Sequence, residues 1–247
     1  MSGRGAWPRS GHGGTLKPNL GSFPVPGPYY LRATHNVALV GSAARNAIRD
    51  GKTPTLDHLA VHYGVRAIQQ LLNRFGAKLS EDGVFGNATH TAVRNFQASK
   101  NVRIDGIVGP TTMRLLLLPL IKEIGGSNWT VVYGLLKNEG AFDPGAVGYV
   151  DESDLGLAQI NTRAHPTYSV EQRFDPVVAV QFNADYLKNA LAALGNTRDA
   201  VLSYNLGIGG VRTWIKAGRP RYYSPDGGTM RDTTAYVDRV MNAYKEL

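Results

Sequence analysis

The chain has 247 residues, of which 43% are hydrophobic and 19% charged, and this length suits two domains with separate cores. Its formal net charge of +8 and sequence pI of about 9.7 favour an anionic partner, such as nucleic acid, a membrane surface or the bacterial cell wall. The absence of cysteine excludes disulfides, cysteine-ligated zinc and thiol nucleophiles.

The N-terminal part of the chain gives weak structural signals. Residues 1–28 are rich in Gly, Pro and Ser and lack hydrophobic periodicity, which predicts a flexible basic arm. Residues 29–62 form a poorly defined leader in which short helices are predicted, one of them over 55–64. His58 and His62 have the spacing of metal ligands on a helix, but the neighbouring sequence offers no third ligand, so we expect no metal site.

Two further observations concern export and membranes. No apolar run follows the basic start of the chain, so we expect no signal peptide. The longest apolar stretch, "LLLLPLI", is far shorter than the roughly 20 residues of a membrane-spanning helix, and it contains a proline. We therefore expect no integral membrane segment.

An internal repeat marks the next block of the sequence. "DGVFGNAT" begins at Asp82 and "DGIVGPTT" begins at Asp105, and both copies read Asp-Gly-x-x-Gly-x-x-Thr. Each copy opens with an Asp-Gly turn and leads into helical periodicity. An earlier helix is predicted from Val65 to Gly76 in "VRAIQQLLNRFG". Residues 63–118 are therefore predicted to form a small bundle of three helices.

This block resembles the peptidoglycan-binding domain found on many bacterial and phage wall enzymes, and the resemblance covers nearly the whole module. It implies a non-catalytic three-helix anchor whose surface groove holds fragments of the wall. The candidate wall-binding residues are Asp82, Arg94 and Asp105. The glycines of the repeat are also what tight turns need, and its apolar residues are what a small core needs.

Glu139 lies in "KNEGAFDP", directly after the apolar run "WTVVYGLL". The pattern predicts a helix over residues 121–136, so Glu139 falls at its end. A carboxyl group partly withdrawn from water has its charged form disfavoured, and its pKa rises toward the range of a general acid at neutral pH. Glycosidic cleavage needs such an acid. A single glutamate at a helix end is more often a solvated surface residue, so the interpretation depends on its companions.

Three later motifs accompany Glu139 in order along the chain. They are "DLGLAQIN" with Gly156, Gln159 and Asn161, "LSYNLGIGGV" with Tyr204 and Asn205, and "TTAYVDRV" with Tyr236. Together with Glu139 they resemble the catalytic domain of the soluble lytic transglycosylases, which share a lysozyme-like fold with goose-type lysozymes. The resemblance covers residues 121–247.

The resemblance implies a role for each of these residues. Glu139 would protonate the glycosidic oxygen between N-acetylmuramic acid and N-acetylglucosamine. As a base it would then take a proton from the C6 hydroxyl of the muramic sugar, which closes a 1,6-anhydro ring. Tyr204 would orient Glu139, Asn205 would hold the substrate, and the remaining residues would contact the sugar or line the cleft. The candidate substrate-binding residues are Gln159, Tyr204, Asn205, Tyr236, Gly156 and Asn161.

Two positions depart from that family's pattern. Gly140 stands where the family usually has serine after the catalytic glutamate, and Ala158 stands where it usually has methionine. Neither change removes a proton donor, so we expect them to affect substrate positioning more than activity. A non-catalytic wall-binding protein is an alternative that the same two residues support slightly.

The acidic stretch "YVDESDLG" leaves the mechanism open. A hydrolytic lysozyme of the inverting type needs a second carboxylate to activate water, and Asp151, Glu152 and Asp154 stand just before the Gln159 motif. A solvated acidic loop is the alternative explanation of these residues. Products with 1,6-anhydro ends would favour the transglycosylase, and reducing muramic ends would favour the hydrolase.

The two halves of the chain support one another. A wall anchor joined to a wall-cleaving domain concentrates an enzyme on its insoluble polymer. Their order resembles a modular phage endolysin, which implies a protein made in the host cytoplasm that acts on the wall at lysis; a virion-associated lysin and a bacterial wall enzyme are alternatives. No nucleic-acid motif is present, so the expected partner is the glycan strands of peptidoglycan, bound by a monomer that needs no cofactor.

The predicted fold is mainly α and has two domains. A three-helix peptidoglycan-binding module over residues 63–118 is expected to connect, through residues 115–120, to a lysozyme-like catalytic domain over 121–247. A small β element is expected near residues 147–157 of that domain.

Overall fold

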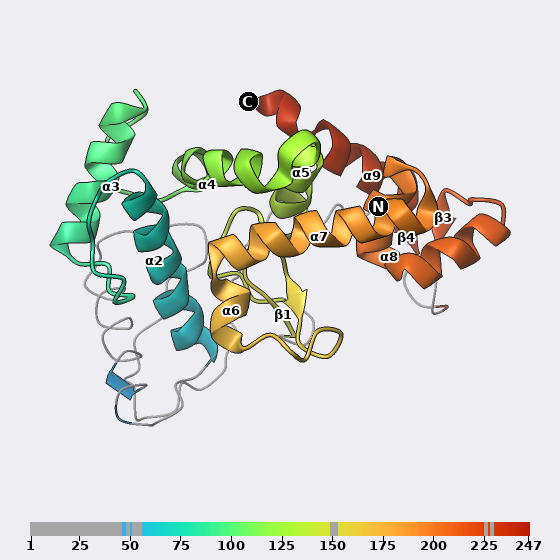
Figure 1. Cartoon of the computed structure of the whole chain (residues 1–247), viewed down its shortest axis with the longest axis horizontal. Coiled ribbons are helices and arrows are strands. Elements are labelled where there is room, and N and C mark those ends of the chain that lie inside the picture. The colour runs from blue at the N-terminus through green and yellow to red at the C-terminus, as the bar shows by residue number, and fades with distance from the viewer. Residues whose placement is uncertain (1–45, 48–49, 51–55, 149–152, 225–226, 228–229) are drawn as a thin grey trace. The chain divides into compact units, whose positions relative to one another are not determined.

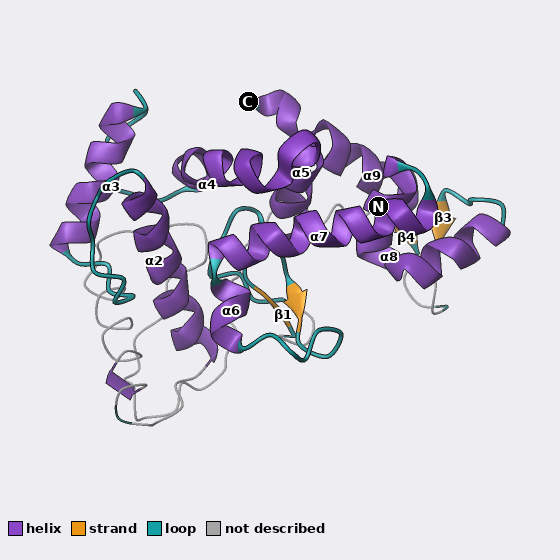
Figure 2. Ribbon diagram, in the orientation of Figure 1, coloured by secondary structure: helices purple, strands orange, loops and turns teal. Residues whose placement is uncertain are grey.

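The computed structural model describes residues 46–47, 50, 56–148, 153–224, 227 and 230–247. Helices make up most of this part of the chain (Figure 1), and strands of two residues each lie between some of them (Figure 2). The predicted mainly α fold with a small β element is therefore confirmed. The basic arm predicted over 1–28 lies outside the described residues, as does most of the leader predicted over 29–62.

Contacts within the chain divide it into two compact units. The first unit combines Met1–Pro119 with Gly140–Ala179, and the second unit combines Leu120–Glu139 with Val180–Leu247. The segment with the Gly-Leu-Ala-Gln motif therefore shares a unit with the helices of the repeat. Glu139 belongs to the second unit, together with the two motifs nearer the C-terminus.

Three helices of the first unit carry the repeat. They are α2 (Leu56–Arg74), α3 (Asn87–Ser99) and the N-terminal part of α4 (Pro110–Gly125). The structure has one helix, α2, where the sequence predicts two that meet at Val65. That prediction is wrong because Val61, Val65 and Ile68 form a continuous buried stripe along α2. Gly76, just beyond the helix, has a positive φ of 87°, which ends the helical path.

Residues 115–120, which are predicted to connect two domains, lie inside α4. Leu116, Leu117 and Leu120 are buried on one face of this helix, and the boundary between the two units falls between Pro119 and Leu120. The connecting role of the segment stays a prediction. Pro119 stands on the exposed side of α4 and removes one backbone hydrogen bond. The burial of the neighbouring leucines offsets that loss, so the helix continues through the proline.

The small β element lies in the first unit. Its strands are β1 (Asp154–Leu155) and β2 (Ile160–Asn161), which pair antiparallel. Val147 forms a further bridge to Leu155. The β element expected near residues 147–157 is therefore confirmed, and the Gly-Leu-Ala-Gln motif forms the turn between its strands.

Helix α2, which precedes the repeat, packs on this β element and on α6 (Val170–Phe174), as Figure 1 shows for α2 and α6. The buried cluster between them consists of Ala60, Val147, Leu155 and Phe174. The ring of Tyr63 on α2 stacks on Phe174 with 5.8 Å between centroids. Arg66 of α2 also forms an ion pair with Glu171 of α6. α2 is therefore part of the core that supports the Gly-Leu-Ala-Gln turn.

The second unit is built from helices and one short hairpin. They are the C-terminal part of α4, η2 (Gly126–Asn128), α5 (Trp129–Gly140), most of α7 (Pro176–Leu194), α8 (Thr197–Lys216), β3 (Tyr222–Tyr223), β4 (Arg231–Asp232), α9 (Thr233–Asn242) and η3 (Ala243–Glu246). The continuous helix predicted over 121–136 is wrong, because Gly126 has a positive φ of 51° and separates α4 from α5. Within the described residues, every helix is too short or too polar to cross a membrane.

Candidate active site

Glu139 is half-buried on the last turn of α5, and neutral donors hold its carboxylate. The hydroxyl of Tyr236 on α9 donates to Glu139 Oε1 at 2.6 Å. The side-chain amide of Asn138 donates to the same oxygen at 3.1 Å, and its own carbonyl oxygen accepts from Arg239 Nε at 3.4 Å. Both of these donors are uncharged, and they orient the carboxylate.

Tyr236 is the buried member of this pair. Burial is the main cause that raises the pKa of Tyr236 well above its ordinary value, and the neighbouring Glu139 carboxylate is the next. The phenol therefore keeps its proton at neutral pH and remains a donor to Glu139. The sequence predicts that Tyr236 lines the site, and the structure places it in direct contact with the catalytic candidate.

A close crossing of α5 and α9 brings these two side chains together. A β-carbon at Gly134 would lie 1.9 Å from the carbonyl oxygen of Val240, so the two helices can approach this closely only at a glycine. Tyr236 stands one turn before Val240 on α9, and Glu139 stands beyond Gly134 on α5. Glycine inside a helix costs about 1 kcal/mol relative to alanine, so the close approach explains its presence.

The second motif places Tyr204 and Asn205 on α8, in the same unit as the catalytic carboxylate. The Tyr204 hydroxyl donates to Asn183 Oδ1 on α7 at 2.5 Å, and its ring packs edge-on against Tyr186 with 4.9 Å between centroids. Arg231 of β4 holds Asn205. Arg231 Nη1 donates to the backbone carbonyl oxygen of Asn205 at 2.7 Å and to its side-chain oxygen at 2.9 Å. Both motif residues are therefore fixed by side chains from other elements.

A kink in α8 follows these two residues. Gly207 has φ 73° and ψ 157°, a conformation that interrupts the helix and favours glycine. Gly209 has open space around its α-carbon and no positive φ. Of Gly207 and Gly209, Gly207 therefore has the clear backbone role.

The Gly-Leu-Ala-Gln turn of the first unit is braced from within. Gly156 has a positive φ of 70°, and a β-carbon there would lie 1.9 Å from the carbonyl oxygen of Arg173. Gln159 also has a positive φ, 49°, and its Nε2 donates to the Gly156 carbonyl oxygen at 2.9 Å. Both residues thus define the shape of the turn, and their contact with substrate stays a prediction.

Gly140 packs against the backbone of this turn. A β-carbon at Gly140 would lie 2.4 Å from the carbonyl oxygen of Leu157 and 2.8 Å from its Cα. Backbone atoms cannot swing aside as a flexible side chain can, so serine does not fit at this position. The departure from the family pattern after Glu139 is therefore a packing requirement. Ala141 and Phe142 then continue with positive φ values of 50° and 59°, which turn the chain sharply.

Asn161 has a full set of local contacts. Its Nδ2 donates to Asp154 Oδ1 at 2.8 Å, and its Oδ1 accepts from two backbone amides of the following loop at 2.9 Å each. Asp154, a candidate second acid, is thus tied into the β1–β2 hairpin. The other two candidates, Asp151 and Glu152, lie outside the described residues. In the part of the chain that the structure describes, no three His, Asp or Glu side chains are grouped to hold a metal ion.

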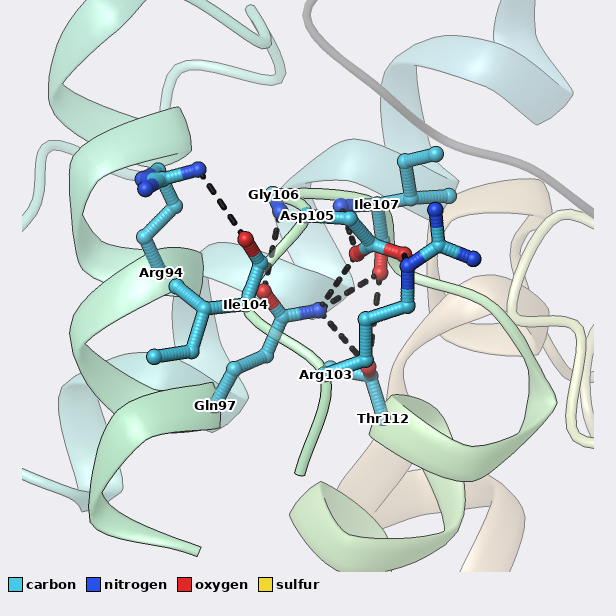
Figure 3. Close-up of polar contacts among 8 residues, drawn as sticks. All are labelled: Arg94, Gln97, Arg103, Ile104, Asp105, Gly106, Ile107 and Thr112. Carbon is cyan, nitrogen blue, oxygen red and sulfur yellow. Dashed lines mark hydrogen bonds and ion pairs between the residues drawn. The ribbon is translucent and has the colours of Figure 1, made fainter. Parts of the chain in front are cut away.

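A glutamine organises each Asp-Gly turn of the repeat, and Figure 3 shows the second copy. The side-chain amide of Gln97, on α3, donates to Asp105 Oδ1 at 2.9 Å and accepts from the Gly106 backbone at 2.9 Å. The backbone N–H of Ile107 also donates to Asp105, which is the main reason that the pKa of Asp105 lies below its ordinary value. Arg94 donates to a carbonyl oxygen of the neighbouring loop at 3.1 Å.

The first copy has the same construction. Gln69 of α2 donates to Asp82 Oδ1 at 2.9 Å and accepts from the Gly83 backbone at 2.9 Å. His62 and His90 occupy matching positions, because a β-carbon at the glycine of each turn would lie 2.2 Å from the imidazole ring. Both aspartates of the repeat therefore serve its turns, and a part for them in wall binding stays a prediction.

Several residues that position the motif side chains escape prediction from the sequence. Gly134 and Asn183 leave a faint signal, since one is a glycine inside an apolar helix and the other a polar residue on a buried helix face. Asn138 and Arg231 leave none, because their partners are identified only by the fold.

Comparison with known protein families agrees with this geometry. Residues 62–116 match the family model of a peptidoglycan binding domain, and residues 121–223 match that of the transglycosylase SLT domain. No curated protein matches the chain at a significant level. The chain therefore carries a peptidoglycan-binding domain followed by a transglycosylase SLT domain. It is an enzyme with lytic transglycosylase activity, which acts by cleaving peptidoglycan.

Proposed function

We propose that this enzyme cleaves the bond between N-acetylmuramic acid and N-acetylglucosamine, with Glu139 serving first as acid and then as base. The observation that carries the proposal is the half-buried Glu139 carboxylate, held at 2.6 Å by the Tyr236 hydroxyl. Protonated Glu139 gives its proton to the glycosidic oxygen as the bond to the muramic C1 breaks. The carboxylate then takes the C6 hydroxyl proton while the C6 oxygen bonds to C1, which closes a 1,6-anhydro ring.

Tyr236 supports both proton transfers. Its hydroxyl donates to Oε1, which stabilises the carboxylate that forms when the first proton leaves. Asn138 donates to the same oxygen. Since Tyr236 is buried and neutral, it does not compete as a proton donor to the sugar.

Several other carboxylates of the second unit form ion pairs. The paired residues are Asp199 with Arg219, Asp232 with Arg221, Asp238 with Arg198 and Glu246 with Lys137. Hydrogen bonds from Arg219 lower the pKa of Asp199, and those from the Ala235 backbone and then Arg221 lower the pKa of Asp232, so these two carboxyl groups are poor proton donors at neutral pH. Asn138 and Tyr236, which donate to Glu139, are neutral, and this suits a group that must give and recover a proton.

The test is mass spectrometry of the fragments that the enzyme releases from purified peptidoglycan. Glu139→Gln is expected to lower the release of 1,6-anhydro fragments by at least about 100-fold, because it removes the proton donor. Glu123→Gln, the same change at an exposed carboxylate of α4, is the matched control and should retain the parent rate. Release of reducing muramic ends would contradict the transglycosylase chemistry, and full activity of Glu139→Gln would contradict the role of Glu139.

We also propose that the enzyme is a phage endolysin, made in the host cytoplasm and used for host lysis. An anchor domain ahead of a catalytic domain and a net charge of +8 suit rapid attack on an anionic wall polymer. When the chain is expressed inside bacteria, lysis is expected only after the inner membrane is permeabilised. Lysis without permeabilisation would favour an exported enzyme, and Glu139→Gln should not lyse the cells under either condition.

A further inference from the structure

Arg231, the first residue of β4, contacts Asn205 of α8 at two atoms. Its Nη1 donates to the backbone carbonyl oxygen of Asn205 at 2.7 Å and to the side-chain oxygen at 2.9 Å. The first contact has a local cause. Carbonyl groups in the last turn before a break in a helix lack their intrahelical donors, and α8 is interrupted at Gly207, shortly after Asn205. Arg231 supplies such a donor.

The second contact determines how the Asn205 amide is turned. A guanidinium group has only donors, so an amide that meets it must place its oxygen toward the guanidinium and its nitrogen away from it. Asn205 is half-buried, and its Nδ2 donates to no residue that the structure describes. That nitrogen is not one of the enclosed atoms that lack a partner, so solvent reaches it. The amide therefore presents a donor to its surroundings.

The segment that holds Asn205 also holds the catalytic carboxylate. β4 leads directly into α9, whose N-cap is Asp232, the residue after Arg231. Tyr236 lies about one helical turn after this N-cap, and its hydroxyl donates to Glu139 Oε1 at 2.6 Å. Helix α9 also packs against α8, which carries Asn205. One continuous segment therefore contacts both Glu139 and Asn205.

We propose that Arg231 is a positioning residue for glycan binding beside Glu139, because it holds the Asn205 amide with its nitrogen toward the sugar. The sugar atom that this nitrogen meets is an acceptor oxygen, since Nδ2 can only donate. Without Arg231, the amide can rotate by half a turn and present Oδ1, which cannot bond to an acceptor. The inference rests on the proposed function, since it assumes that sugar binds beside Glu139.

The experiment compares three substitutions of Arg231 on soluble glycan strands, with kcat/KM and Tm measured for each. Arg231→Lys keeps a donor and should retain most of the parent kcat/KM. Arg231→Met removes the donor, so the amide takes both orientations and kcat/KM should fall by about threefold. Arg231→Glu offers only acceptors and turns Nδ2 toward itself. It should lower kcat/KM by a further factor of about ten, the equivalent of one hydrogen bond.

The comparison of Arg231→Met with Arg231→Glu separates this role from a structural one. Both variants remove the donor to the Asn205 carbonyl oxygen, so a role confined to the backbone of α8 predicts equal values of kcat/KM. In the Asn205→Ala background the difference should disappear, because no amide is left to turn. Arg212→Glu, the same reversal of charge at an exposed arginine of α8, is the matched control and should keep the parent kcat/KM.

Two outcomes would overturn the inference. The first is an equal kcat/KM in Arg231→Met and Arg231→Glu. The second is a difference between them that persists in the Asn205→Ala background, which would show that the added charge acts by itself.

Asn205→Asp repeats the test if Arg231→Glu does not fold or Asn205→Ala is inactive. It keeps an acceptor for Arg231 but removes the amide donor, so kcat/KM should fall by at least about tenfold with no fall in Tm, and a parent kcat/KM would overturn the inference. Full activity of Glu139→Gln would defeat the proposed function itself. An inactive Glu139→Gln beside equal Arg231→Met and Arg231→Glu would defeat this inference alone.

Discussion

The repeat of the first unit and the Glu139 site of the second unit use buried polar side chains for different ends. Gln69 and Gln97 each satisfy the backbone of a nearby turn, and the two copies have matching hydrogen bonds at 2.9 Å. Tyr236 instead reaches Glu139 across a separation of 97 residues in the sequence. The two glutamines therefore stabilise the backbone of their turns, whereas Tyr236 orients a carboxylate that can exchange a proton with a substrate.

The largest effect is expected at Gly140, which follows Glu139 in the chain and packs against the backbone of Leu157. Gly140→Ser should abolish activity and cost at least about 3 kcal/mol, because its β-carbon would collide with the Leu157 backbone 2.4 Å away. Activity on soluble glycan and Tm are the measurements. Gly86→Ser is the control, since Gly86 has open space and caps α3, where serine is favourable. A Gly140→Ser enzyme with parent activity and Tm would show that the turn does not rest on this glycine.

A smaller effect, confined to chemistry, is expected at Tyr236. Tyr236→Phe should lower kcat on soluble glycan by about 10- to 100-fold, since it removes one hydrogen bond to a charged acceptor. Its Tm should change little, because the ring still packs. Tyr222→Phe removes a hydroxyl from a ring that is 54% exposed and should have the parent rate. An unchanged kcat in Tyr236→Phe would place this hydroxyl outside the reaction.

In the repeat, a substitution is expected to lower stability and leave kcat unchanged. Gln97→Leu should cost about 2 kcal/mol of stability, because it leaves the Gly106 N–H buried without its acceptor. Wall binding should be lost at a lower temperature, while kcat on soluble glycan at 25 °C stays at the parent value. Gln69→Leu should lose a similar amount by calorimetry. A fall in kcat without a fall in Tm would contradict the structural role of these glutamines.

The smallest effect is expected at the ion pair between buried Asp199 and exposed Arg219 of the second unit, and it depends on pH. Hydrogen bonds from Arg219 are the main cause that lowers the pKa of Asp199. A lowered folded pKa adds stability above the unfolded value of about 3.9 and loses it as the pH falls through the folded value. Asp199→Asn should therefore cost about 1–2 kcal/mol at pH 7, and the difference should shrink below pH 4 in urea titrations. A gap that widens in acid would reverse the assigned sign.

The parts of the molecule differ in how far the sequence predicts them. The turns of the repeat could be predicted because Asp82 and Asp105 accept hydrogen bonds from backbone amides two residues further along the chain. Such local contacts leave a recognisable sequence pattern. Glu139 and Tyr236 could be named from the order of motifs, but their 2.6 Å contact depends on how α5 crosses α9. That crossing is set by Gly134, which the sequence does not distinguish from other glycines.

Errors in helix boundaries have one physical cause. The helix predicted over 55–64 was expected to end at Gly64, where burial instead continues the helix. α4 continues through Pro119 because leucines on both sides of it are buried, and α2 continues through Gly64 for the same reason. Gly126 did end a helix, because it takes a positive φ. The backbone angle of such residues is fixed by packing that a local pattern does not contain.

The chemistry at Glu139 can be tested by digesting purified peptidoglycan in heavy-oxygen water and reading the new glycan ends by mass spectrometry. A mechanism in which one carboxylate gives and recovers the proton uses no water at the muramic C1. It predicts 1,6-anhydro ends that carry no heavy oxygen, and the loss of these products in Glu139→Gln. Heavy oxygen at each new reducing end would contradict this account and would require a second group that activates water.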